Sequence, residues 1–115
     1  MVLVVEDEPL LRMMACDMVI DAGFEVVGAS NADKAVEILE TRPDIRIVFT
    51  DIDMPGSMDG MKLAAAIRDR WPPIKIILTS GHMQPAADAM PPHSVFFAKP
   101  YPPDRVVAEM QRMAA

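Results

Sequence analysis

The chain has 115 residues, 51% of them hydrophobic and 5% aromatic, which suits one globular domain with a single core. Its 11 Lys and Arg against 17 Asp and Glu give a formal net charge of −6, which argues against direct binding to nucleic acid or to an acidic membrane surface. A lone cysteine, Cys16, excludes an internal disulfide, and no apolar stretch has the length of a membrane span. We therefore expect a soluble, cytoplasmic protein.

The N-terminal segment combines a short strand pattern with a helical one. Residues 2–5 are apolar and mostly β-branched, which predicts a buried strand, and the acids Glu6 and Asp7 follow it directly. From Pro9 to Gly23 the apolar period changes to that of a helix. On this period the core face holds Leu11, Met14, Met18 and Ala22, and the partly exposed face holds Leu10, Met13 and Ile20. Those exposed residues are either scattered surface hydrophobes or a docking face for a partner helix.

The central part of the chain repeats this alternation. Residues 24–29 predict a strand, and Ser30 with Asp33 resembles a capping box at the start of a helix that ends before Pro43. Residues 47–50 predict a strand buried on both faces, and this strand stops at the carboxylate of Asp51. After a loop over residues 54–60, a further helical pattern ends at Trp71.

Two more strands and a final helix complete the chain. Residues 74–78 predict a strand followed by Thr79 and Ser80, and residues 95–98 predict a strand followed by Lys99. Between them, prolines interrupt residues 84–92, where one or two helical turns fit at most. A helix follows Pro102. We therefore predict an α/β fold, a single doubly wound five-stranded parallel sheet with five helices, the fourth short or irregular.

Polar side chains follow four of the five predicted strands, and this pattern indicates a site. Parallel strands all end at the same edge of a sheet, so Glu6, Asp7, Asp51, Thr79 and Lys99 are expected to converge there. Several carboxylates close together repel one another unless a cation holds them, and oxygen ligands without His or Cys favour Mg²⁺. A carboxylate beside a divalent ion, a lysine and a hydroxyl is suited to hold a phosphoryl group, and the carboxylate can itself be the nucleophile.

The motifs resemble those of the receiver domain of bacterial two-component response regulators. They are Glu6-Asp7-Glu8-Pro9, Thr50-Asp51-Ile52-Asp53-Met54-Pro55, Thr79-Ser80-Gly81 and Ala98-Lys99-Pro100. Each motif alone is a weak signal, but their order and spacing match over essentially the whole chain, so residues 1–115 are interpreted as one receiver domain. The resemblance implies a flavodoxin-like sheet with strand order 2-1-3-4-5.

The resemblance also implies a role for each site residue. Asp51 would accept a phosphoryl group from a phosphohistidine of a sensor histidine kinase or histidine phosphotransfer protein. Mg²⁺ would be bound by Asp7 and Asp51 directly, by Asp53 through its backbone carbonyl and by Glu6 through water. Lys99, Thr79 and Ser80 would contact the phosphoryl oxygens. Phe96 would occupy the aromatic switch position and turn inward as Thr79 moves.

Two departures from the family pattern bear on partners. The loop over residues 54–60 is one residue longer than usual, and the proline-rich segment 84–92 replaces a helix through which many receivers dimerise or contact their outputs. We expect an output partner of unknown identity and a possible homodimer. The protein would be either a free-standing regulator or a receiver from a larger protein, and in neither case a metabolic enzyme beyond Mg²⁺-dependent self-phosphorylation and self-dephosphorylation.

Two other functions fit parts of the pattern. Asp51 and Asp53 after an apolar strand also resemble the nucleophile motif of haloacid-dehalogenase-type phosphatases, although that family places its acidic pair after the nucleophile, whereas Glu6 and Asp7 come before it here. The third possibility is an interaction module that keeps the fold and acts without phosphorylation. The intact set of Asp51, Asp7, Thr79 and Lys99 argues against this module.

Overall fold

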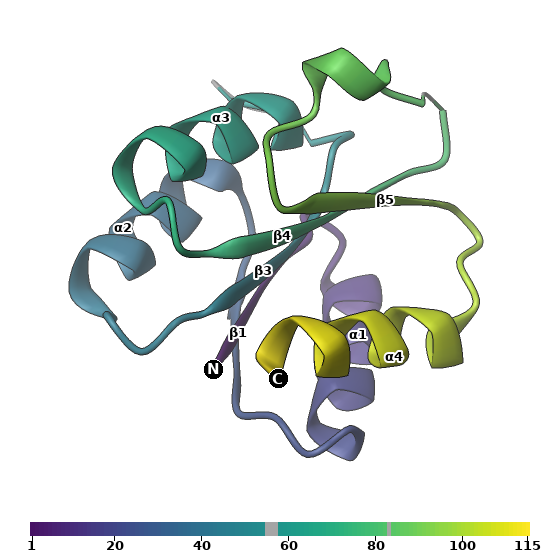
Figure 1. The fold of residues 1–115 in the computed structure, drawn as a ribbon. Helices are drawn as coiled ribbons and strands as arrows, with labels where there is room; N and C mark the ends of the chain where they lie inside the picture. The colour runs from purple at the N-terminus through teal and green to yellow at the C-terminus, as the bar shows by residue number, and fades with distance from the viewer. Residues whose placement is uncertain (55–57, 83) are drawn as a thin grey trace.

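The computed structural model describes residues 1–54, 58–82 and 84–115, which form a five-stranded sheet with flanking helices (Figure 1). The predicted extra residue in the loop after Asp51 involves residues 55–57, which lie outside the described residues. In chain order the elements are β1 (Val2–Val5), α1 (Pro9–Asp21), β2 (Val26–Ala29), α2 (Ala32–Thr41), β3 (Ile47–Asp51), α3 (Gly60–Arg70), β4 (Lys75–Ser80), the 3-10 helix η1 (Ala87–Ala89), β5 (Ser94–Ala98) and α4 (Pro103–Ala114).

All neighbouring strands pair in parallel, in the order β2-β1-β3-β4-β5. This order confirms the predicted doubly wound fold. Every residue of β1 and β3 is buried, as expected for central parallel strands covered by helices on both faces. The register places Asp51 of β3 opposite Thr79 of β4, so the carboxyl ends of these two strands meet at one edge.

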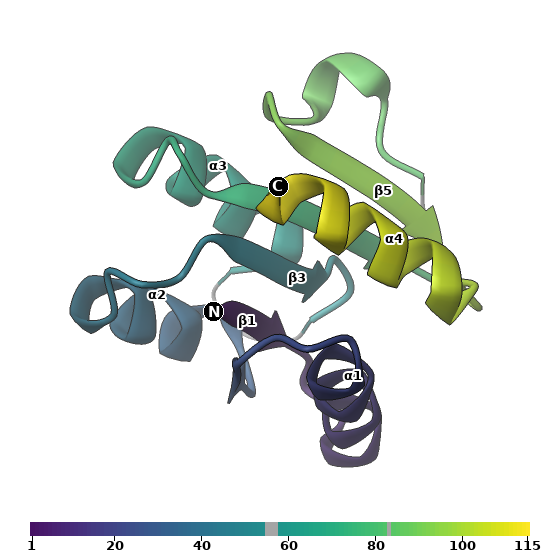
Figure 2. The same cartoon turned by 60° about the horizontal axis from the view of Figure 1, so that its bottom comes forward.

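Two core layers cover the sheet because alternate side chains of each strand point to opposite faces. On one face Leu3 and Val5 pack with apolar residues of α2 and α3. On the other face Val2 and Val4 pack with apolar residues of α1 and α4. The view in Figure 2 shows α1 and α4 together on one side of the sheet. The site described below opens between these two helices.

The fourth crossover holds a three-residue 3-10 helix instead of an α-helix. Prolines at positions 85, 91 and 92 flank it, and proline lacks the N–H that a longer helix needs. The prediction of a short or irregular fourth element is therefore confirmed. The described part of the chain has four α-helices, one fewer than the five helices predicted. Several boundaries also differ by a few residues: β2 begins at Val26, β4 runs over Lys75–Ser80 and β5 begins at Ser94. Asn31 instead of Ser30 caps α2, accepting a hydrogen bond from the Lys34 N–H at 2.8 Å.

The predicted core face of α1 was wrong for Leu11 and Met14, whereas Met18 is half-buried and packs against the core. The exposure predicted for Leu10, Met13 and Ile20 is confirmed. The residues that α1 buries are Ala15 and Val19, while Leu11 and Met14 are 43% and 56% exposed. A small side chain such as Ala15 lets the helix backbone approach the sheet closely, which turns the longer side chains outward. Among residues 1–54, 58–82 and 84–115, no helix is both long enough and apolar enough to cross a bilayer.

Candidate functional site

Asp51 ends β3 and is the centre of the site. Its side chain is 6% exposed, and the backbone around it is tightly packed. Gly60, the first residue of α3, lies so close that a Cβ there would be 2.3 Å from the Asp51 carbonyl oxygen. The Gly60 N–H donates to the Ile52 carbonyl at 3.1 Å. The glycine therefore allows α3 to begin against the backbone of the residue that we expect to carry the chemistry.

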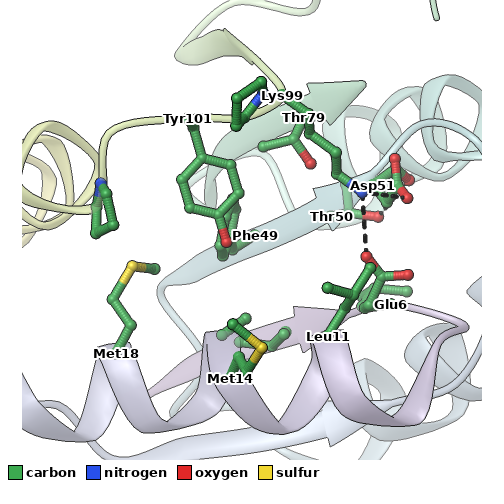
Figure 3. Close-up of a pocket in the computed structure, with 15 residues that line it drawn as sticks. Glu6, Leu11, Met14, Met18, Phe49, Thr50, Asp51, Thr79, Lys99 and Tyr101 are labelled. Carbon is green, nitrogen blue, oxygen red and sulfur yellow. Dashed lines mark hydrogen bonds and ion pairs between the residues drawn. The ribbon is translucent and has the colours of Figure 1, made fainter. Parts of the chain in front are cut away.

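Lys99 reaches Asp51 from the end of β5. Its Nζ lies 2.9 Å from Asp51 Oδ2 and 3.2 Å from Glu6 Oε1 (Figure 3). Burial, the largest single influence, would lower the pKa of Lys99, but the hydrogen bond and charge of Asp51 and the charge of Glu6 raise it above its ordinary value. The lysine is therefore a fixed positive charge beside two nearly buried carboxylates. The convergence predicted from the strand ends is confirmed for these residues.

Three carboxylates form a compact cluster. Glu6, Asp7 and Asp51 each offer an oxygen, and these oxygens lie within 4.8 Å of one another. Glu6 Oε2 also accepts a hydrogen bond from the Glu8 N–H at 3.2 Å. Burial, the largest influence, raises the pKa of Glu6 above its ordinary value, and the Glu8 hydrogen bond and the Lys99 charge offset it only in part. One ammonium, in contact with two of these three acids, leaves excess negative charge, and an all-oxygen donor set of this size fits a hard divalent cation.

Asp53 is linked both to Asp51 and to the next strand. Its N–H donates to Asp51 Oδ1 at 3.1 Å, and its Oδ2 accepts a short hydrogen bond from the Ser80 hydroxyl at 2.6 Å. The Ser80 oxygen in turn accepts from the His82 N–H at 3.1 Å. The hydroxyl of Ser80 is therefore directed at Asp53, although the sequence led us to expect it on a phosphoryl oxygen.

Thr79 and Phe96 lie on different sides of the sheet edge. Thr79 is 3% exposed and lines the same cavity as Asp51. Phe96 pairs with Leu78 in the strand register, and its half-buried ring packs against the core on the α2 and α3 face. Leu78, the strand partner of Phe96, directly precedes Thr79 in β4. A displacement of Thr79 can therefore reach the aromatic ring through one intervening residue.

A cavity of about 510 Å³ extends from Asp51 along the sheet, between α1 and the chain that leads into α4. In Figure 3 the side chains of Leu11, Met14 and Met18 lie on its α1 side, with Tyr101 and Phe49 opposite. The rings of Tyr101 and Phe49 make an edge contact with centroids 5.5 Å apart. The sequence did not identify this cavity, because Leu11 and Met14 were assigned to the core.

The fold and the site together define a class: a doubly wound α/β protein with an acidic cluster and a lysine at the carboxyl edge of its sheet. The sequence matches the profile of the response regulator receiver domain family over residues 2–111. The chain therefore belongs to the response regulator receiver family, and the predicted family resemblance is confirmed. This membership decides against the haloacid-dehalogenase alternative.

Individual relatives agree with this assignment. The chain is 38% identical over 118 residues to the chemotaxis protein CheY of Thermotoga maritima, an alignment that covers 98% of this chain and 96% of that protein. It is 32% identical over 115 residues to a putative NtrX-like response regulator of Rickettsia bellii, covering 96% of this chain but 24% of the relative. A crystal structure of a response regulator receiver protein from Sinorhizobium medicae superimposes with a TM-score of 0.86 at 29% identity, covering 97% and 91% of the two chains.

Receiver domains are phosphoacceptor switches of two-component systems that interact with sensor kinases and output domains, and this chain is one of them. The relatives differ in length, since this chain spans about a quarter of the NtrX-like protein and nearly all of CheY.

Proposed function

We propose that Asp51 is the phosphoacceptor of this receiver domain. The observation that carries the proposal is the position of its carboxylate, held 2.9 Å from the Lys99 ammonium and within 4.8 Å of two further acidic oxygens. A carboxylate oxygen of Asp51 would attack the phosphorus of a phosphohistidine. The phosphorus–nitrogen bond would break, its electron pair would stay on the imidazole, and an acyl phosphate would form on Asp51.

The acidic cluster fits Mg²⁺, which Asp7 and Asp51 would bind directly, Asp53 through its backbone carbonyl and Glu6 through water. When bound, Mg²⁺ would neutralise charge on the phosphoryl oxygens. Lys99 would contribute the second positive charge. Its present contact with Asp51 Oδ2 places its ammonium where an oxygen of the phosphorylated side chain would also be within reach.

Thr79 and Phe96 would carry the signal away from Asp51. Transfer of a phosphoryl group adds roughly −1.5 to −2 charge at one point, and the Thr79 hydroxyl would move to donate a hydrogen bond to it. The ring of Phe96, which packs on the other face of the sheet, would turn further inward as Thr79 moves. Ser80 would exchange its hydrogen bond with Asp53 for one with the phosphoryl group.

The groove between α1 and α4 is our candidate docking surface for the histidine phosphodonor, a sensor kinase or a phosphotransfer protein. The groove begins at the Asp51 cavity and continues between α1 and α4 to a second hollow lined by Met14, Met18, Pro103 and Val107. Three acids, Asp17, Asp21 and Asp104, line the same hollow. Apolar side chains within an acidic rim complement an amphipathic helix with basic residues.

Phosphate uptake tests the proposal directly. Incubation with acetyl phosphate and MgCl₂ should add the mass of one phosphoryl group to the wild-type protein and none to Asp51→Asn, as read by intact mass spectrometry. EDTA should abolish the uptake by the wild type. An unmodified wild-type protein would instead support an interaction module that acts without phosphorylation.

A further inference from the structure

One cation near the acidic site, Arg12, belongs neither to the lysine contact nor to the expected family roles. This arginine lies in the first turn of α1, and its Nη1 donates to the backbone carbonyl of Glu6 at 2.8 Å. The Glu6 N–H is bonded to the Ala29 carbonyl of β2 at 3.1 Å. Glu6 is the first residue after β1, and it is therefore held at its N–H by β2 and at its carbonyl by Arg12.

The neighbouring strand leaves room for this arginine. Gly28 is an exposed residue within β2, where glycine weakens a strand and needs a reason. Its backbone does not supply that reason, because Gly23 is the glycine with positive φ among the described residues. A Cβ on Gly28 would lie 3.4 Å from Arg12 Cδ and 3.5 Å from Arg12 Cγ. The Cys16 Sγ would lie equally close, at 3.5 Å, and all three distances are ordinary van der Waals contacts. Alanine would therefore fit at position 28, whereas a larger, branched side chain would meet the stem of Arg12.

We propose that Arg12 is a positioning residue for the metal ligands of the acidic cluster. The carbonyl of Glu6 and the N–H of Asp7 belong to one planar peptide unit, so the bond from Arg12 that orients the carbonyl also sets the direction in which Asp7 leaves the strand. Asp7 is one of the three acids whose oxygens lie within 4.8 Å of one another. Mutual repulsion of these acids tends to open the turn, and the arginine opposes that opening from the backbone side.

This inference rests on the proposed magnesium site and adds a residue that does not touch the ion. Groups that orient metal ligands typically affect affinity by about tenfold or more. We therefore expect Arg12→Met to weaken Mg²⁺ binding about tenfold. Arg12→Lys, which keeps one donor on a long stem, should recover part of the affinity. Gly28→Val should weaken binding by placing a branched side chain where the Arg12 stem now lies, whereas Gly28→Ala should remain near wild type.

Arg46 offers a matched control. Its Nη1 also donates to a backbone carbonyl, that of Pro43 at 2.7 Å, but it precedes β3 at the opposite edge of the sheet from Asp51. Arg46→Met should therefore leave Mg²⁺ affinity unchanged. The measurement is isothermal titration of each folded variant with MgCl₂ at one temperature well below every melting temperature, with circular dichroism to confirm the fold.

The outcomes separate the two proposals. If Arg12→Met binds Mg²⁺ as tightly as wild type, or loses no more affinity than Arg46→Met, the positioning role is overturned while the magnesium site stands. If the wild type itself binds no Mg²⁺, the proposed site fails first. Should Arg12→Met not fold, Gly28→Val against Gly28→Ala decides the question, and equal affinity of these two would overturn the inference.

Discussion

Gly60→Ala gives the sharpest test of how the fold supports Asp51, because two effects of opposite sign compete. Alanine is the better helix former by up to about 1 kcal/mol, which favours the variant. Against it, the new Cβ would lie 2.3 Å from the Asp51 carbonyl oxygen and 2.7 Å from Ile52 Cα. Ordinary contact begins at 3.4 Å, so backbone must move by about 1 Å, and overpacking of this kind costs about 1–3 kcal/mol.

We expect the steric cost to win, because the clash is with backbone and no flexible side chain can absorb it. The net loss should be about 1–2 kcal/mol, which for a domain of this size lowers the melting temperature by roughly 5–10 °C. Phosphate uptake from acetyl phosphate should also slow, since the displaced atoms belong to Asp51. Gly81→Ala is the control: its Cβ would meet Lys99 Cβ at 3.8 Å and should change little. Melting of Gly60→Ala at or above the wild-type temperature would refute the reasoning.

The Lys99 contact, the Cys16 thiol and the groove beside α1 can each be tested. In EDTA at pH 7, Lys99→Met should lose about 1–2 kcal/mol of stability, a figure reduced because the lysine is 26% exposed. The folded-state pKa of Glu6 is raised, and the Lys99 charge is one of the influences that hold it down. A raised pKa contributes stability that is present below the ordinary pKa and lost as pH rises, so protonation of Glu6 should make the loss caused by Lys99→Met smaller near pH 5 than at pH 7. Equal losses by urea denaturation at both pH values would contradict this. Burial raises the pKa of Cys16, so iodoacetamide at pH 8 should alkylate it more slowly than a free cysteine peptide, and a rate equal to the peptide's would count against that. The double variant Leu11→Gln, Met14→Gln should accept phosphate from acetyl phosphate normally but more slowly from a histidine phosphotransfer domain active on the wild type; slowing with both donors would place these residues in the chemistry instead.

The sequence predicts the sheet and its acidic edge well because both depend on strong local signals. Short β-branched runs that end in acids, such as the one before Asp51, can hardly be anything but buried parallel strands in an alternating chain. The direction of parallel strands then brings Asp51 and Lys99 together without any knowledge of the packing. Contacts that join a side chain to a backbone group outside its own helix, such as Arg12 to the Glu6 carbonyl, leave no pattern of that kind.

Gly28 is a position where the sequence does carry part of the signal. A glycine inside an otherwise apolar strand indicates close approach by another group, and the sequence contains that signal. It does not say which group approaches, because several residues of the following or preceding helices could reach the edge strand. The structure shows two side chains of α1 there, Arg12 and Cys16, both in van der Waals contact with the position of the missing Cβ.

The error on α1 has a physical cause that also bears on function. The helix is apolar on most of its surface, so a core face chosen by period alone is ambiguous, and small Ala15 packs against the sheet instead of Leu11 and Met14. A helix that is apolar all round is normally covered on all sides. Here Leu11 and Met14 are exposed within the described chain, and both line the cavity that leads to Asp51. Leu11 and Met14, which the helical period predicts to be buried, are therefore exposed at the surface where we expect a partner to deliver the phosphoryl group.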